Sequence, residues 1–174
     1  HGKDTTAGFI KTALESDGYS VLIAHYGDLV KYICKTFFGW DGQKDEYGRS
    51  LLQRIGTDVI RARDQDYWVR FIGTILWFFK DEWDYVLIPD CRFPNEVNYL
   101  GDNGFDVIHI RVVRDGFKSP LTIEQQNHPS ETALDDSQPD IYIHNAGTLN
   151  DLRQTVSEIV TELNGHHQIS FDEV

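Results

Sequence analysis

The first residues with a chemical pattern are Gly2-Lys3-Asp4-Thr5-Thr6, which run directly into a helical segment. They match the second half of the phosphate-binding loop GxxxxGK[ST], without its leading glycine and the strand before it. Amide groups at a helix N-terminus and a Lys side chain both favour phosphate. We therefore predict that these five residues bind the phosphates of a nucleotide, and that Asp4 or Thr5 helps to hold Mg²⁺. The alternative is that Asp4 or Thr5 only caps the helix.

A second group begins after the apolar run 85–88, at Pro89-Asp90-Cys91-Arg92-Phe93-Pro94-Asn95-Glu96. Phosphotransferases place the acid that holds Mg²⁺ or its waters at the end of a buried strand, so Asp90 is a candidate metal ligand. Arg92 could bridge phosphates. The alternative is an Asp90–Arg92 ion pair in a turn, followed by a helix start in which Glu96 lies near the positive end. A metal nuclease would need a Lys where this chain has Asn98.

A third group lies on a predicted helix over residues 48–63. Arg54, Asp58 and Arg61 are spaced i, i+4 and i+7, away from an apolar face. Arg63 and Trp68 follow closely. Guanidinium groups and an aromatic ring suit a nucleoside monophosphate, because the arginines bind phosphate and the ring stacks on a base. The alternative is a solvated helix with weak surface ion pairs.

The last group surrounds a polar loop at 115–130. Arg114 precedes this loop, Lys118 lies within it and His128 stands at its end. A basic loop could close over phosphates and exclude water, as lids do in phosphoryl transfer. His128 could instead be an exposed loop residue. We keep Arg114 as a candidate catalytic residue.

Alternating strands and helices must position these groups. Apolar periodicity predicts helices over 4–15, 27–38, 48–63, 66–80, 94–102 and 148–164, and strands over 19–24, 85–88, 107–113 and 141–143. This order predicts an α/β sandwich with a mainly parallel sheet and right-handed crossovers. Ligands of such sheets bind outside the carboxyl ends of the strands, where Asp90 and Arg114 are expected.

Composition narrows the class of protein. The chain has 174 residues and a formal charge of −12, which argues against non-specific binding to a nucleic-acid polymer. The apolar run at 71–79 is too short for the roughly 18 to 20 residues of a membrane span. Two cysteines without a CxxC pattern fit reduced thiols, and no secretory signal opens the chain. We expect a cytoplasmic protein.

Taken together, these segments resemble the phage and bacterial deoxynucleoside monophosphate kinase family. The resemblance is carried by HGKDTTA, DLVKYI, KTFFGWDG, LLQRIGTDVIRARDQDYWVR, IPDCRFPNEV, HPSETALD and HNAGTLNDL, in this order. It implies a P-loop, nucleoside-monophosphate-kinase-like three-layer sandwich: one domain over 1–174, with a helical monophosphate-binding region at about 27–82 and a lid at about 115–130. It also implies that ATP and Mg²⁺ are used to phosphorylate a deoxynucleoside 5′-monophosphate.

The resemblance assigns roles to individual residues. It implies that Gly2, Lys3, Asp4 and Thr5 surround the ATP phosphates, that Asp90 and Arg92 lie near the metal and the transferred group, and that the acceptor is bound by Arg54, Asp58, Arg61 and Arg63. The leading glycine and first strand of the loop motif are missing, and the sequence contains no Met, so we expect natural residues before His1.

Three questions stay open at this point. The chain could be a P-loop kinase for another phosphorylated acceptor, such as phosphomevalonate or dephospho-coenzyme A. It could also be a nucleotide-binding regulatory protein without transfer activity. A homodimer is compatible with the sequence, which does not decide the oligomeric state.

Overall fold

The structure of the chain, a computed structural model, describes residues 2–114, 116, 119 and 121–167. Lys118, within the expected lid, lies outside the described residues. The elements in chain order are α1 (Lys3–Ser16), β1 (Val21–Ile23), α2 (Gly27–Phe38), α3 (Glu46–Gln53), the π-helix η1 (Arg54–Arg61), α4 (Tyr67–Phe78), β2 (Tyr85–Leu87), α5 (Pro94–Asp102), β3 (Ile110–Val113), α6 (Ile123–Gln126), α7 (Pro129–Thr132), β4 (Ile141–His144) and α8 (Leu149–His167).

The strands form two parallel pairs. β1 pairs with β2 and β3 pairs with β4, so the expected parallel direction is confirmed. The expected single sheet is not seen among the described residues, because no strand pairing joins β2 to β3. The predicted strand 107–113 is shorter in the structure. Only Ile110–Val113 pair with another strand, because β4, their partner among the described residues, has four residues.

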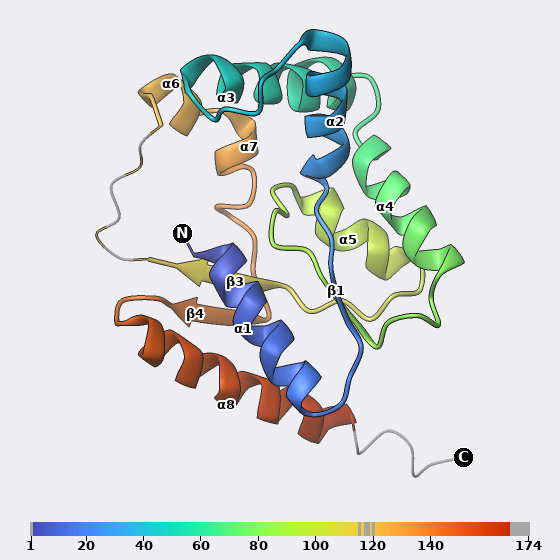
Figure 1. The fold of residues 1–174 in the computed structure, drawn as a ribbon, viewed down its shortest axis with the longest axis vertical. Helices are drawn as coiled ribbons and strands as arrows, with labels where there is room; N and C mark the ends of the chain where they lie inside the picture. The colour runs from blue at the N-terminus through green and yellow to red at the C-terminus, as the bar shows by residue number, and fades with distance from the viewer. Residues whose placement is uncertain (1, 115, 117–118, 120, 168–174) are drawn as a thin grey trace.

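One apolar cluster covers both strand pairs. Ile10 and Leu14 of α1 and Val156 and Val160 of α8 are buried against Ile143 of β4, and residues of all four strands pack around them. α1 and α8 lie side by side over β3 and β4 (Figure 1). The two strand pairs therefore share one apolar cluster with α1 and α8, and the chain has a mixed α/β fold with short parallel sheets.

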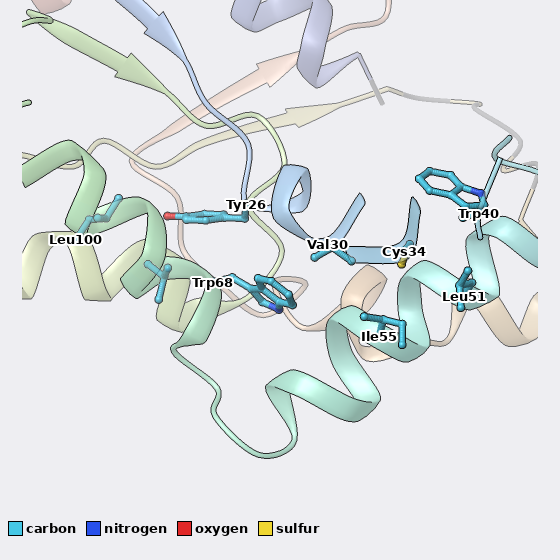
Figure 2. Packing of buried hydrophobic residues seen from close by; sticks show 9 residues of the cluster. Tyr26, Val30, Cys34, Trp40, Leu51, Ile55, Trp68 and Leu100 are labelled. Carbon is cyan, nitrogen blue, oxygen red and sulfur yellow. The ribbon is translucent and has the colours of Figure 1, made fainter. Parts of the chain in front are cut away.

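A second core holds the helical region together. Val30 and Cys34 of α2, Ile55 of η1 and Trp68 and Val69 of α4 are among its buried residues. Figure 2 shows the side chains of Val30, Cys34, Ile55 and Trp68 between the helices. Two regions with separate cores can present a site where the chain passes from one to the other.

The predicted helix over 48–63 is divided in the structure. Its first part is α3 and its second part is η1, in which, for example, the Ala62 amide donates to the Thr57 carbonyl five residues before. The indole N–H of Trp68 donates to the Gly56 carbonyl at 2.8 Å, so a side chain takes part in satisfying this helix's backbone. Such interruptions of the regular ladder are frequent at functional sites.

Two short helices, α6 and α7, were not predicted, because four residues show no periodicity. Both have side-chain caps: Thr122 accepts from the Gln125 amide and His128 from the Ser130 amide. Among the described residues, no helix is long and apolar enough to cross a bilayer.

Alanine substitutions at two glycines should have opposite effects on the free energy of unfolding. A Cβ on Gly48 would stand 2.0 Å from the Gln43 carbonyl oxygen and 2.6 Å from Trp40 Nε1, whereas a Cβ on Gly8 meets nothing within 4 Å. We expect Gly48→Ala to lower the free energy of unfolding by about 1–3 kcal/mol or more, because the backbone must move. Gly8→Ala, in the interior of α1, should raise it by about 0.5–1 kcal/mol. Urea denaturation of both variants checks this, and a neutral Gly48→Ala would contradict the packing described here.

Candidate functional site

The N-terminus of α1 lies at the carboxyl end of β4. Gly2 has φ 101°, and a Cβ there would stand 2.7 Å from the side-chain nitrogen of Asn145, the residue after β4. Lys3, Asp4 and Thr5 are exposed in the first turn of the helix. The fold therefore presents the positive end of a helix, with its first-turn amides and an ammonium group, at the edge where ligands of parallel sheets bind.

Thr6 differs from its neighbours in the loop pattern. It is 2% exposed, and its hydroxyl is buried without a hydrogen-bond partner in the described part of the chain. The side chain therefore faces the interior, and nucleotide binding by Thr6 stays a prediction.

His25 connects this edge to the next helix. It follows β1, and its Nε2 lies 3.7 Å from the Asp4 carboxylate while its Nδ1 lies 3.7 Å from that of Asp28. Lys31 pairs with the same Asp28 carboxylate at 2.7 Å. Sequence reasoning missed His25, although its place directly after a buried strand could have indicated it.

Asp90 follows β2 at the same edge. Its carboxylate accepts hydrogen bonds from the amides of Tyr26 at 3.0 Å and Gly27 at 2.8 Å. The end of β2 is thus tied to the start of α2, two residues from His25. Lys3 and Asp90 accordingly come from segments that meet at one edge, because Asp4 contacts His25 and Asp90 contacts the next two residues.

The carboxylates at this edge fit Mg²⁺ only in part. Both oxygens of Asp90 already accept amide hydrogens, whereas the Asp4 side chain is 86% exposed. No group of three or more His, Cys, Asp or Glu residues among the described ones could hold a metal. Mg²⁺ commonly binds through one or two carboxylates, substrate phosphates and water. Asp4, with Thr5 beside it, fits a Mg²⁺ ion that is otherwise bound by phosphates and water. Direct coordination by Asp90 stays a prediction.

Arg92 turns away from Asp90 and toward α7. Its guanidinium donates to the Ser130 carbonyl at 2.9 Å and forms an ion pair with Glu131. The suggested Asp90–Arg92 ion pair is therefore not formed. Arg114 is exposed directly after β3, at the carboxyl edge.

A buried ion pair lies behind this loop. Arg61 and Glu96 are 9% and 4% exposed and form a salt bridge. Glu96 also accepts from the amides of Arg92 at 2.6 Å and Phe93 at 3.1 Å. Burial raises the pKa of the Glu96 carboxyl, against the opposing effect of these amides and of Arg61. Burial also raises the pKa of the neighbouring Cys91 thiol to about 12, so this cysteine stays protonated near neutral pH.

Arg61 forms one side of a pocket. Its guanidinium carbon lies 3.8 Å from the centre of the Phe93 ring, and it donates to the Gln65 carbonyl and the Asn95 side chain, both at 2.9 Å. Its Nε is buried without a partner among the described residues. The pocket has a volume of about 530 Å³ and is lined by Thr57, Asp58, Arg61, Ala62, Gln65, Phe93, Pro94 and Asn95. This volume is within the range of small-molecule sites.

Of the other predicted acceptor residues, Asp58 lines this pocket, whereas Trp68, Arg54 and Arg63 do not. Trp68 is 3% exposed and belongs to the helical core, so in contrast to the expected role its ring has no free face for a base. Arg54 lies near the Phe38 ring, at 5.9 Å, and neither it nor the exposed Arg63 lines the pocket. The alternative interpretation of this helix, with ion pairs of Asp58 to Arg54 and Arg61, is not seen among the described residues, because Asp58 instead contacts His128.

Comparisons with known proteins point to one family. The family model described as deoxynucleotide monophosphate kinase matches residues 30–156, which include the pocket and His128 but not Gly2–Thr6. A protein named deoxynucleotide monophosphate kinase from Enterobacteria phage T4 is 37% identical over 106 residues, 60% of this chain and 41% of that protein. Its namesake from Escherichia phage RB69 is 32% identical over 114 residues, 64% of this chain and 44% of that protein. The matched segments span about two fifths of the length of these curated relatives.

Removal of the buried acid tests the structural part of the site. We expect Glu96→Ala to lower the free energy of unfolding by about 3–5 kcal/mol, because it leaves the Arg61 charge and two amides buried without their acceptor. Urea denaturation measures the change. The exposed Glu82 provides a matched control, and Glu82→Ala should change stability by less than about 0.5 kcal/mol. A loss below about 1 kcal/mol for Glu96→Ala would contradict a buried pair.

Proposed function

The chain belongs to the deoxynucleotide monophosphate kinase family, and on that basis we propose that it transfers the γ-phosphoryl group of ATP to a deoxynucleoside 5′-monophosphate. The products are a deoxynucleoside diphosphate and ADP. The observation that carries the proposal is the joining of two sites by one loop. Asp90 binds the start of α2 next to His25, which contacts Asp4 of α1, and Phe93, Pro94 and Asn95 of the same loop line the pocket.

We assign the two substrates to the two ends of this loop. ATP phosphates would bind at the N-terminus of α1, where Lys3 supplies a point charge and the Gly2–Thr5 turn supplies amide groups. The acceptor would bind in the pocket beside Arg61, whose buried and unpartnered Nε–H adds to the positive potential there. Mg²⁺, when bound, would neutralise charge on the β- and γ-phosphates, with Asp4 as its protein ligand.

The reaction needs positioning more than covalent chemistry. An oxygen of the acceptor phosphate attacks the γ-phosphorus, and the bond from that phosphorus to the β–γ bridging oxygen breaks. The attacking oxygen is already anionic, so no strong general base is required. Arg92 and Arg114 would stabilise the charge of the moving phosphoryl group, for which Arg92 must exchange its Glu131 partner for phosphate. The segment 115–130 would act as a lid over this step.

Substrate class is tested by a coupled assay of ADP release with ATP and a panel of acceptors. We expect turnover with at least one deoxynucleoside monophosphate and none with phosphomevalonate or dephospho-coenzyme A. Turnover with either of those compounds alone would establish a different kinase. ATP binding without turnover of any acceptor would support a regulatory nucleotide-binding protein.

Substitution of Lys3 tests the proposed ATP site at the N-terminus of α1. Its side chain is exposed at the start of α1, so Lys3→Ala should leave the unfolding free energy within about 0.5 kcal/mol of the wild type. We expect kcat to fall by about 10²–10³-fold, because a charge that stabilises the transition state is lost. Lys80→Ala, at an exposed Lys after α4, is the matched control and should keep full activity. An unchanged kcat in Lys3→Ala would contradict the proposal that ATP binds at the N-terminus of α1.

A further inference from the structure

His128, near the end of the segment 115–130, contacts the acceptor pocket. Its Nε2 lies 3.2 Å from Oδ1 of Asp58, a pocket residue on η1 that is 70 positions away in the sequence. On its other side, Nδ1 lies 3.2 Å from the Ser130 amide nitrogen and 2.9 Å from the Ser130 hydroxyl. The imidazole is largely buried, with 16% of the side chain exposed.

These contacts assign the protons of the ring. The Ser130 amide can only donate, so Nδ1 must carry a lone pair and accept from it. In the neutral imidazole the proton is then on Nε2, which donates to the Asp58 carboxylate. His128 therefore has two separate functions: Nδ1 caps α7, and Nε2–H orients Asp58.

The ring is fixed from both ends of its segment. Before it, Gln125 is buried and reaches the Ser50 hydroxyl of α3 at 3.4 Å. After it, the Ser130 carbonyl accepts from Arg92 at 2.9 Å. His128 is thus held in place by elements on both sides, as a positioning group requires.

Asp58 keeps one oxygen available to the pocket. Oδ1 is engaged by His128, whereas Oδ2 has no hydrogen bond among the described residues and the side chain is 56% exposed. A carboxylate repels a phosphate but accepts from a neutral donor. In a deoxynucleoside monophosphate such donors are the 3′-hydroxyl of the sugar and the N–H groups of the base.

We propose that Asp58 binds a neutral hydrogen-bond donor of the acceptor nucleotide, and that His128 is the positioning residue that aims its carboxylate. This inference rests on the proposed function, because it takes the pocket as the acceptor site. It places the acceptor phosphate toward Arg61 and the sugar or base toward Asp58. It also makes α7 part of the acceptor site rather than only a surface turn.

Two conservative variants separate the two functions of His128. The Asn in His128→Asn can still cap α7 through its side-chain oxygen, which replaces Nδ1, but it has no donor at the position of Nε2. The Gln in His128→Gln extends its amide to that position and can donate to Asp58. Asp58→Asn keeps an acceptor for His128 and presents an amide to the pocket. His109→Asn, before β3 at the opposite end of the strand from Arg114, is the matched control.

The experiment is isothermal titration of the full chain with dGMP, dAMP, dTMP and dCMP, and separately with ATP. For the nucleotide that binds the wild type, we expect His128→Asn and Asp58→Asn each to raise Kd about tenfold or more, the effect of a hydrogen bond to a charged group. His128→Gln should stay within about threefold of the wild type, and His109→Asn should be unchanged. The double variant of His128→Asn and Asp58→Asn should be no weaker than Asp58→Asn alone, and ATP binding should not change.

The 2′,3′-dideoxy analogue of the same nucleotide identifies the donor. If Asp58 binds the 3′-hydroxyl, the analogue binds the wild type weakly and His128→Asn has no further effect. If Asp58 binds a base N–H, His128→Asn weakens the analogue as it weakens the parent nucleotide. Either result supports the proposal.

The possible failures are distinct. Wild-type Kd values in His128→Asn, or equal weakening of ATP and nucleotide binding, overturn the positioning role and leave the kinase proposal standing. If the wild type binds none of the four nucleotides, the acceptor pocket itself is overturned, and this inference with it. Thermal melting shows whether each variant folds. If His128→Asn does not, a wild-type Kd in Asp58→Asn still overturns the proposal.

Discussion

The buried pair of Glu96 and Arg61 is the interaction on which the site depends. Glu96 is the third residue of α5, and its carboxylate accepts from two amides of the preceding loop while it pairs with the last residue of η1. Water is nearly excluded from both side chains, so neither charge has another partner of comparable strength. The pair therefore fixes the loop that carries Asp90 and Arg92 against the helix that carries Asp58.

This arrangement places functional groups between two cores. The strand cluster under α1 and α8 holds the edge where Lys3 and Asp4 emerge, and the helical cluster holds the pocket. The hydrogen bonds from Tyr26 and Gly27 to Asp90 connect them at the point where β1 leads into α2. A reaction between two bound phosphates requires such a connection, because a displacement of the loop would change the distance between them.

The overall charge gives little information about the site. A net charge of −12 disfavours binding to a polyanion, yet the pocket wall contains a guanidinium group stacked on an aromatic ring. Arg61 is held by a carboxylate, a carbonyl and an amide oxygen, so its orientation is set before any ligand arrives. Local geometry, rather than the sum of charges, determines which anions the protein can bind.

The sequence by itself determined the local features. The limits of α2 and α5 agree with the prediction, because they depend on neighbouring residues: Gly39 adopts a positive φ at the end of α2, and Pro94 occupies the first position of α5. The parallel direction of the strands also followed from the alternation of strands and helices. The buried position of Trp68 could not be predicted, because an aromatic residue next to arginines is compatible with both a core and a binding site.

Only the tertiary structure decided which side chains meet. The partners Arg61 and Glu96 are 35 residues apart, and Asp58 and His128 are 70 apart. Spacing rules reach one or two helical turns, so they offered Arg54 and Arg61 as partners of Asp58 and could not find the true one. The same limit explains why His25 was missed and why one sheet was expected where the described strands form two pairs. Contacts between distant segments depend on how the two cores pack, and no short stretch of sequence carries that information.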